Sequence, residues 1–477
     1  MDTLTNPHTD EQLDILYAAT ATRDNLMISA LAGTGKTTTL EAVERAVPRS
    51  PILYLVFNKK NAVEASIRMM STTTVRTFNS LGHRIWAAAQ SQGLKVDAKK
   101  SNIIYRSIID NGPTDLRDTL WGIYHEVISG VALAKALGYI PEGIYPNARR
   151  LVTRSQFHNM LEEMPDDLTA DLIDTVLKRS IKQAYDGLID YNDQVYMPAL
   201  FGGTFPKFPL VLVDEYQDLS PVNHALLERL VKARLIGVGD PYQNIYGFRG
   251  AKAGGMKQAT AAYACASFPL SISFRCPSEI VKHVHWRVPH FRWLTEGGSI
   301  ERPDRLQVSD LPDEATIICR NNAPLFNCAM RLLSAGRSIA ISGSDIGPRL
   351  VGTMRKLGPE TLARDGVLQS IEEWRADKLE KESKTANDMA DCMRVFAEQG
   401  KDLLQAIIYA EHLFKQNGRI QLTTGHKAKG LEWSTVYHLD PWLVRRTPSE
   451  QEKNLDYVIS TRSRDRLIEI NTEQLEW

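Results

Sequence analysis

Residues 29–40 read Ser-Ala-Leu-Ala-Gly-Thr-Gly-Lys-Thr-Thr-Thr-Leu, and this stretch decides the fold. The apolar segment 25–29 before it predicts a strand, and the segment 40–47 after it predicts a helix. A strand, a glycine-containing turn and Gly-Lys-Thr at a helix start are typical of a phosphate-binding loop. Gly33 and Gly35 let backbone N–H groups approach a phosphate, and the helix start adds partial positive charge.

This loop predicts a site for ATP and Mg²⁺. Lys36 is expected to reach the β- and γ-phosphates, and the Thr37 hydroxyl is expected to bind Mg²⁺. Upstream, the Gln12 amide can donate to and accept from an adenine edge, with a solvated helix residue as the alternative. The other loop residues expected to contact the nucleotide are Ala32, Gly33, Thr34, Gly35 and Thr38.

Two further apolar strands end in residues suited to ATP hydrolysis. The strand 209–213 is followed by Asp214, expected to hold Mg²⁺ through water, and by Glu215, expected to act as general base. The strand 235–239 ends in Gly-Asp and leads to Gln243, whose amide is placed to contact a γ-phosphate. Ligands bind at the carboxyl edge of open α/β sheets, so the sequence predicts one site at that edge.

Polar, basic and aromatic residues near other strand ends are candidates for contacts with an unpaired nucleic-acid strand, because bases stack on aromatic faces and phosphates attract cations. Core packing is the alternative for Phe57, and a purely structural role is the alternative for Tyr246. The candidates are Phe57, Asn58, Lys59, Thr77, Tyr246, Phe248 and Arg249.

The segment from about 81 to 189 has helical spacing of apolar residues and carries no phosphate motif. We therefore expect a helical insertion into the first α/β domain. Its basic residues either touch a nucleic-acid backbone or are solvated, and they include Lys99, Lys100, Arg149 and Arg150.

The composition narrows the class of protein. The 477 residues suggest two to four domains, and 57 basic against 57 acidic residues argue against a broad basic surface for duplex DNA. Five cysteines without a C-x-x-C pair argue against a disulfide scaffold, a zinc site or an iron–sulfur site. The chain shows no signal peptide and no run near the roughly 18 apolar residues of a membrane helix. We expect a protein of a reducing cytoplasm, without membrane contact.

Three stretches together resemble the superfamily 1 helicases of the UvrD/Rep/PcrA type: 32–37, 214–218 and 239–251. The resemblance is closest to the compact F-box DNA helicase and phage-encoded branch, and with it we expect the cytoplasm of a bacterium or of a phage-infected host cell. It implies a DNA contact for Asn79, where the family more often has His. Ala30, which stands where the general phosphate-loop pattern has Gly, is common in that family.

The resemblance extends into the second half of the chain. Residues 270–279 match the family's motif IV, which implies that Arg275 is an arginine finger and that Phe274 takes the place of a tyrosine stacked on adenine. Residues 454–462 match motif VI, which implies that Arg462 is a second arginine facing the γ-phosphate. A cation at that point would stabilise charge spreading on the transferred group.

Residues 421–434 match motif V of the same family. The resemblance implies that Thr424 and His426 contact the DNA backbone. It also implies that Gly430 and Glu432 approach the nucleotide.

The expected fold class is α/β, with two tandem RecA-like P-loop domains that have parallel sheets and mostly helical insertions. Domain 1A, which binds ATP, is expected over 1–85 and 186–265, with insertion 1B over 86–185. Domain 2A is expected over 266–345 and 417–477, with a small helical insertion 2B over 346–416.

The sequence therefore predicts an ATP-dependent DNA helicase or translocase acting in replication, repair or recombination. The resemblance implies movement along single-stranded DNA in the 3′→5′ direction. Expected partners are single-stranded DNA, single-strand/duplex junctions and replication or recombination proteins, with a monomer on DNA. The alternatives are a translocase that strips proteins from DNA with little unwinding, a non-catalytic nucleotide-binding module, and an RNA substrate.

Overall fold

The computed structural model describes residues 8–476, except 48–50, 91–92, 144, 146, 162–163, 232–233, 248–249, 251–253, 343–345, 381–385 and 447–448. The chain forms two compact units. The first comprises Met1–Leu31 and Gly35–Leu270, and the second comprises Ala32–Thr34 and Ser271–Trp477. Within the described residues, no helix is both long enough and apolar enough to cross a membrane.

A parallel sheet in the strand order β3-β2-β6-β7-β1-β8 forms the centre of the first unit. The central strands are continuous buried apolar runs, as expected when both faces of a parallel sheet are covered. The strands are β1 (Leu26–Ala30), β2 (Ile52–Val56), β3 (Thr73–Thr77), β6 (Leu210–Val213), β7 (Arg234–Gly239) and β8 (Ala266–Leu270).

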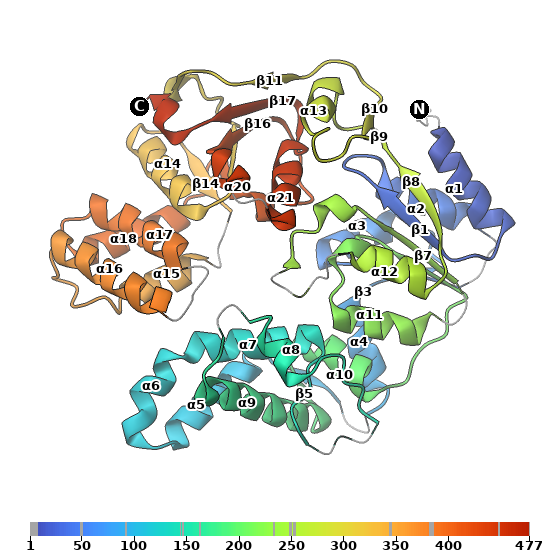
Figure 1. The fold of residues 1–477 in the computed structure, drawn as a ribbon, viewed down its shortest axis with the longest axis horizontal. Helices are drawn as coiled ribbons and strands as arrows, with labels where there is room; N and C mark the ends of the chain where they lie inside the picture. Colours follow the sequence, from blue (N-terminus) through green and yellow to red (C-terminus); the bar gives the residue numbers. More distant parts are fainter. Residues whose placement is uncertain are drawn as a thin grey trace. The chain divides into compact units, whose positions relative to one another are not determined.

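Helices alternate with these strands along the chain and cover the sheet (Figure 1). One apolar cluster joins α1 and α2 to one set of strand residues, and a second joins α4, α10 and α11 to the other set. The helices are α1 (Asp10–Ala21), α2 (Lys36–Ala46), α3 (Lys59–Arg68), α4 (Phe78–Ala87), α10 (Asp193–Phe201), α11 (Pro221–Leu230) and α12 (Gly255–Ala262).

The strand β8 corrects one expected boundary, because the first domain was expected to end at residue 265. β8 pairs with β1 from Leu26↔Ala266 to Ala30↔Leu270 and so belongs to the first sheet. It is the edge strand of that sheet, where Pro269 is tolerated because the strand has a neighbour on one side. Alternating exposure along β8 gives a weaker apolar signal than the buried central strands.

The described residues between α4 and α10 are mostly helical. They share one apolar cluster with α4, α10 and α11, so the insertion has no separate core. A short pair of parallel strands, β4 (Lys95–Val96) and β5 (Leu188–Ile189), joins its two ends. The helices are α5 (Lys100–Asn111), α6 (Arg117–Gly122), α7 (Tyr124–Leu137), α8 (Arg154–His158) and α9 (Asp167–Tyr185).

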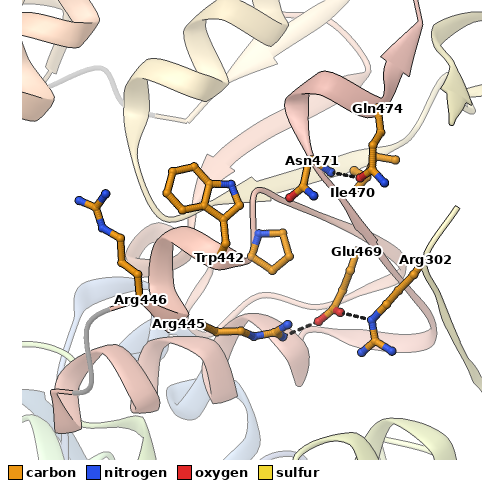
Figure 2. A pocket seen from close by; sticks show the side chains of 9 residues that line it. Arg302, Trp442, Arg445, Arg446, Glu469, Ile470, Asn471 and Gln474 are labelled. Atoms are coloured by element: carbon orange, nitrogen blue, oxygen red, sulfur yellow. Dashed lines mark hydrogen bonds and ion pairs between the residues drawn. The ribbon is translucent and has the colours of Figure 1, made fainter. Parts of the chain in front are cut away.

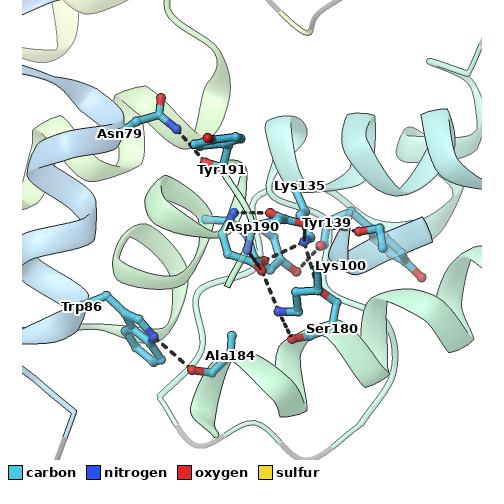
Figure 3. Close-up of polar contacts among 12 residues, drawn as sticks. Asn79, Trp86, Lys100, Lys135, Tyr139, Ser180, Ala184, Asp190 and Tyr191 are labelled. Carbon is cyan, nitrogen blue, oxygen red and sulfur yellow. Dashed lines mark hydrogen bonds and ion pairs between the residues drawn. The ribbon is translucent and has the colours of Figure 1, made fainter. Parts of the chain in front are cut away.

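A buried cluster of charges lies inside this helical region (Figure 3). The Lys100 ammonium lies 2.7 Å from Asp193 Oδ2, and the Lys135 ammonium lies 2.6 Å from Asp190 Oδ2 and 2.7 Å from Asp193 Oδ1. Lys100 also donates to the Ser180 carbonyl at 2.7 Å. Both surface roles considered for Lys100, nucleic-acid contact and solvation, are therefore wrong: this lysine is an internal ion-pair partner.

The second unit contains another parallel sheet, in the order β11-β17-β16-β13-β15-β14. Helices α14 (Asn322–Ser334) and α21 (Glu450–Ser460) accompany it. The strands are β11 (Ser299–Glu301), β13 (Thr316–Cys319), β14 (Ile339–Ile341), β15 (Ile420–Thr424), β16 (Trp433–Leu439) and β17 (Ser463–Ile470).

The chain between β14 and β15 forms a helical group, drawn in orange in Figure 1. Its buried residues belong to the same apolar cluster as α14 and the strands β13 to β17. The group is therefore packed onto the second sheet's core. Its helices are α15 (Ile346–Met354), α16 (Arg364–Glu380), α17 (Ala386–Gln399) and α18 (Leu403–Phe414).

Candidate active site

The loop between β1 and α2 has the backbone of a phosphate cradle. Gly33 and Gly35 have φ values of 70° and 79°, in the left-handed region that glycine enters without a steric cost. Gly35 is the N-cap of α2 and supplies no side chain to cap it. The first N–H groups of α2 are thus open to an anion, which fits the phosphate site expected from the sequence.

The first unit brings Thr37 and Asp214 together. The Thr37 hydroxyl donates to Asp214 Oδ2 at 3.1 Å, and the Tyr54 hydroxyl donates to the same oxygen at 3.0 Å. The described residues contain no cluster of three or more His, Cys, Asp or Glu side chains able to hold a metal. One hydroxyl and one carboxylate instead fit Mg²⁺, which takes few protein oxygens and completes its shell with water and phosphate.

Burial affects the carboxylates of this site. It raises the pKa of Asp214 to about 6, the neighbouring Glu215 charge adds to the rise, and the Lys36 ammonium opposes it. Burial also raises the pKa of Asp240, again against the influence of Lys36. Lys36 therefore lies close enough to both carboxyl groups to act on them electrostatically.

A chain of hydrogen bonds links Glu215 to Gln243. Gln217 donates from Nε2 to Glu215 Oε2 at 2.6 Å and accepts the Asp240 N–H at 2.9 Å. Gln243 donates to Asp240 Oδ2 at 2.7 Å. Glu215 itself has a φ of 52°, a conformation that costs energy in a non-glycine residue and is typical of functional sites. Sequence reasoning assigned no role to Gln217, although it lies within the stretch 214–218 that resembles the helicase family.

Gln12 is buried, so the solvated alternative for this residue is wrong. Its Oε1 accepts the Thr9 N–H at 3.0 Å in the capping box of α1. Its Nε2 donates to the Thr39 hydroxyl at 3.1 Å and so joins α1 to α2. Contact with an adenine stays a prediction.

Phe57 and Tyr246, two candidates for base contacts, lie beside one another. Their rings are stacked at a centroid separation of 6.1 Å with an interplanar angle of 8°. Both rings are partly exposed. The pair therefore forms one aromatic surface. Phe248 and Arg249, predicted to extend it, lie outside the described residues.

The polar candidates of the first unit lie at helix starts. Asn58 caps α3, whose first residue Lys59 is exposed, and Thr77 caps α4. The Asn79 side chain donates to the Tyr191 carbonyl at 2.5 Å (Figure 3). These residues surround helix N-termini, which attract phosphate groups.

The second unit pairs Arg275 with Glu432 in an ion pair. Both were expected near the nucleotide. Arg462, which was also expected there, is buried and donates to the carbonyls of Val458 at 2.9 Å and Leu431 at 3.1 Å. These bonds fix the Arg462 guanidinium beside the segment that leads to Glu432.

Residues Ala32–Thr34 of the phosphate loop count with the second unit and contact its motif IV and motif VI segments. The Ser273 hydroxyl donates to the Ala32 carbonyl at 3.0 Å, and the Phe274 N–H donates to the Gly33 carbonyl at 2.9 Å. The Tyr457 hydroxyl accepts the Ala32 N–H at 2.9 Å. Sequence reasoning gave Tyr457 no role, because this bond joins positions 425 residues apart.

The motif V candidates follow β15. Thr424 is the buried N-cap of the short helix α19 (Gly425–Ala428), and His426 lies partly exposed on that helix. Gly430 has a φ of 83°, and a Cβ there would meet open space. The backbone conformation therefore explains why position 430 is a glycine, whereas crowding by neighbouring atoms does not.

Parallel sheets, a phosphate cradle and a carboxylate pair at a strand end define a P-loop NTPase with tandem RecA-like domains. The pattern of the UvrD/REP helicase N-terminal domain matches residues 10–264, and the chain belongs to the UvrD/REP helicase family. The resemblance to UvrD/Rep-type helicases expected from the motifs is thereby confirmed.

Individual relatives agree with this assignment. The F-box DNA helicase protein 1 of Schizosaccharomyces pombe is 24% identical over 519 residues, which covers 96% of this chain and 57% of that protein. The F-box DNA helicase 1 of Gallus gallus is 24% identical over 525 residues, which covers 96% of this chain and 48% of that protein. DNA helicase II of Escherichia coli is 26% identical over 270 residues, which covers 49% of this chain and 34% of that protein. The chain spans about half the length of the F-box relatives.

Proposed function

We propose that this chain hydrolyses ATP with Mg²⁺ and uses the energy to move along single-stranded DNA and separate duplex DNA. The observation that supports this most is the hydrogen-bonded edge of the first sheet. There the Thr37 hydroxyl donates to Asp214, and a chain of hydrogen bonds links Glu215 to Gln243. The loop between β1 and α2 has the backbone of a phosphate cradle.

Each group at this edge has a proposed role. The phosphate loop and Lys36 would hold the β- and γ-phosphates. Thr37 and Asp214 would hold Mg²⁺, which would neutralise phosphate charge. Glu215 orients and deprotonates the attacking water. Gln243 contacts the γ-phosphate. The hydrogen bonds through Asp240 and Gln217 couple this contact to Glu215. Arg275 and Arg462 supply cations to the transferred phosphate, and Gln12 and Phe274 contact the adenine.

A single DNA strand is the proposed track. The Phe57–Tyr246 surface would stack on bases, and helix starts at Asn58 and Thr77 would hold phosphates. Asn79, Thr424 and His426 would add backbone contacts. By family resemblance, movement is 3′→5′ from a single-strand/duplex junction, by a monomer serving replication, repair or recombination.

Strand displacement tests this proposal against protein stripping. Partial duplex DNA with only a 3′ tail should be separated in an ATP-dependent manner, whereas partial duplex DNA with only a 5′ tail should not. Lys36→Ala should abolish separation of the 3′-tailed substrate. Removal of a DNA-bound protein without strand separation would contradict the helicase proposal and favour the stripping translocase.

A further inference from the structure

Several loops emerge at one edge of the second sheet. The parallel register places Thr424, Cys319, Leu439 and Ile470 in one row across β15, β13, β16 and β17. Neighbouring strands lie about 4.8 Å apart, so this row spans roughly 14 Å. The loops after β16 and β17 therefore share an edge with Thr424, a predicted DNA contact. That edge is where open parallel sheets bind ligands.

A pocket of about 550 Å³ lies on the β16–β17 side of this edge (Figure 2). Helix α20 (Trp442–Arg445) forms one wall, and the loop after β17 forms another. The walls are tied together because Asp440 accepts the Thr472 N–H at 2.8 Å and the Thr472 hydroxyl at 2.6 Å. The volume lies within the range of about 300–1,000 Å³ typical of ligand sites.

Glu469, the carboxylate that lines this pocket, already has hydrogen-bond and ion-pair partners within the protein. It accepts from Arg302 Nε at 2.6 Å and from Arg445, and lies 3.2 Å from His283 Nε2. Burial alone would raise the pKa of Glu469, but the hydrogen bonds from these partners outweigh burial and hold the pKa well below its usual range. Glu469 therefore stays an anion whose charge is compensated within the protein.

The cationic and aromatic groups of the pocket are the more available ones. Trp442 is 50% exposed, and the Arg446 guanidinium lies over its ring at 5.8 Å from the centroid. No carboxylate among the described residues forms an ion pair with Arg446. Arg302 engages Glu469 through Nε, and its side chain is 61% exposed. An exposed indole beside a guanidinium group suits a ligand with a flat ring and a phosphate.

We propose that this pocket holds one nucleotide of a bound DNA strand, with the base on Trp442 and the phosphate at Arg446. This inference rests on the proposed function for the identity of the strand. It adds a contact beyond motif V, on the side of the sheet away from β15. Its place on the same sheet edge as Thr424, roughly 14 Å along the row, favours a continuous strand over a free nucleotide or an acidic peptide.

Photo-cross-linking tests the site without ATP. The probe is a 20-residue oligothymidylate carrying 5-iododeoxyuridine, mixed with the full chain, and the attached peptide is identified by mass spectrometry. Attachment within 440–446 is expected. Trp442→Ala should weaken oligothymidylate binding roughly 5- to 150-fold, the effect of losing one stacked base. Trp442→Phe should retain most affinity. Trp286→Ala, which removes another exposed tryptophan of the second unit, should leave it unchanged.

Other results would overturn the site. Attachment only outside 440–446, or wild-type affinity in Trp442→Ala with unaltered thermal unfolding, would exclude a base on Trp442. Equal competition by free thymidine monophosphate would indicate a nucleotide site instead, and equal competition by oligoglutamate would indicate a peptide site. Attachment at 440–446 together with ATP hydrolysis indifferent to DNA would contradict the motor but support the pocket.

Discussion

The Thr37 hydroxyl and the Asp214 carboxylate are hydrogen-bonded at 3.1 Å although 177 positions separate them in the chain. Thr37 lies in the first turn of α2, the helix after β1, and Asp214 follows β6, so the parallel sheet brings both to one edge. Their oxygens are the ligands that Mg²⁺ prefers.

Replacing Thr37 tests this pair. Thr37→Val keeps the shape of the side chain but removes the oxygen, and should lower the apparent Mg²⁺ affinity about 10- to 100-fold, as loss of a metal-site partner typically does. Thr37→Ser keeps the hydroxyl and should retain most of the affinity. Titration of ATP hydrolysis with Mg²⁺ gives the comparison. Equal Mg²⁺ dependence of the two variants would contradict the assignment.

Asp214 also makes stability depend on pH. Because burial, aided by Glu215, raises its pKa to about 6, the folded state retains a proton that the unfolded state loses near pH 4. The stabilisation from this group is therefore complete below pH 4 and is lost as the pH rises through 6. Asp214→Asn should be more stable relative to the wild type at pH 7.5 than at pH 4.5, by urea unfolding without nucleotide. The control is Asp110→Asn at an exposed position, whose stability relative to the wild type should not show this change with pH. A stability difference between Asp214→Asn and the wild type that is the same at both pH values would contradict the raised pKa.

The buried charges of the helical insertion predict a large difference between two adjacent lysines. Lys100→Met leaves the Asp193 carboxylate with one cationic partner instead of two and should cost about 3–5 kcal/mol of unfolding free energy. Lys99→Met changes an exposed neighbour and should stay within about 0.5 kcal/mol of wild type. Urea unfolding followed by circular dichroism measures both. Similar values for the two variants would mean that the cluster is not stabilised by Lys100.

Gly33 combines a special backbone conformation with crowding. A Cβ at Gly33 would lie 2.4 Å from Arg275 Cβ and 2.9 Å from Ser273 Oγ, at a φ of 70°. Gly336 has a similar φ of 74° but open space around its Cβ. Gly33→Ala should therefore destabilise the chain by more than the roughly 1 kcal/mol expected for Gly336→Ala, and should weaken ATP binding. Equal thermal unfolding and equal ATP affinity of the two variants would exclude a crowded Gly33.

The sequence predicted the parts of the site that lie within short segments. The glycines of the phosphate loop, Thr37 and Asp214 follow apolar strands directly, so strand ends located them. The burial of Lys100 and Gln12 could not be predicted, because it depends on contacts with distant segments. Lys100 meets Asp193 from beyond α9, and Gln12 meets Thr39 on α2.

Connections between distant segments also explain the other differences. Tyr457 bonds to Ala32 through a hydroxyl whose partner no local pattern reveals. The strand β8 was missed because an edge strand with alternating burial lacks the continuous apolar run of β6.

ATP hydrolysis with and without single-stranded DNA tests the central claim most directly. The wild type should hydrolyse ATP much faster with oligothymidylate present, and Glu215→Gln should abolish this stimulation because an amide cannot accept the proton of the attacking water. Glu228→Gln, an exposed change on α11, is the control and should behave as wild type. Hydrolysis that does not respond to single-stranded DNA, or that survives in Glu215→Gln, would contradict a DNA-driven motor centred on this site.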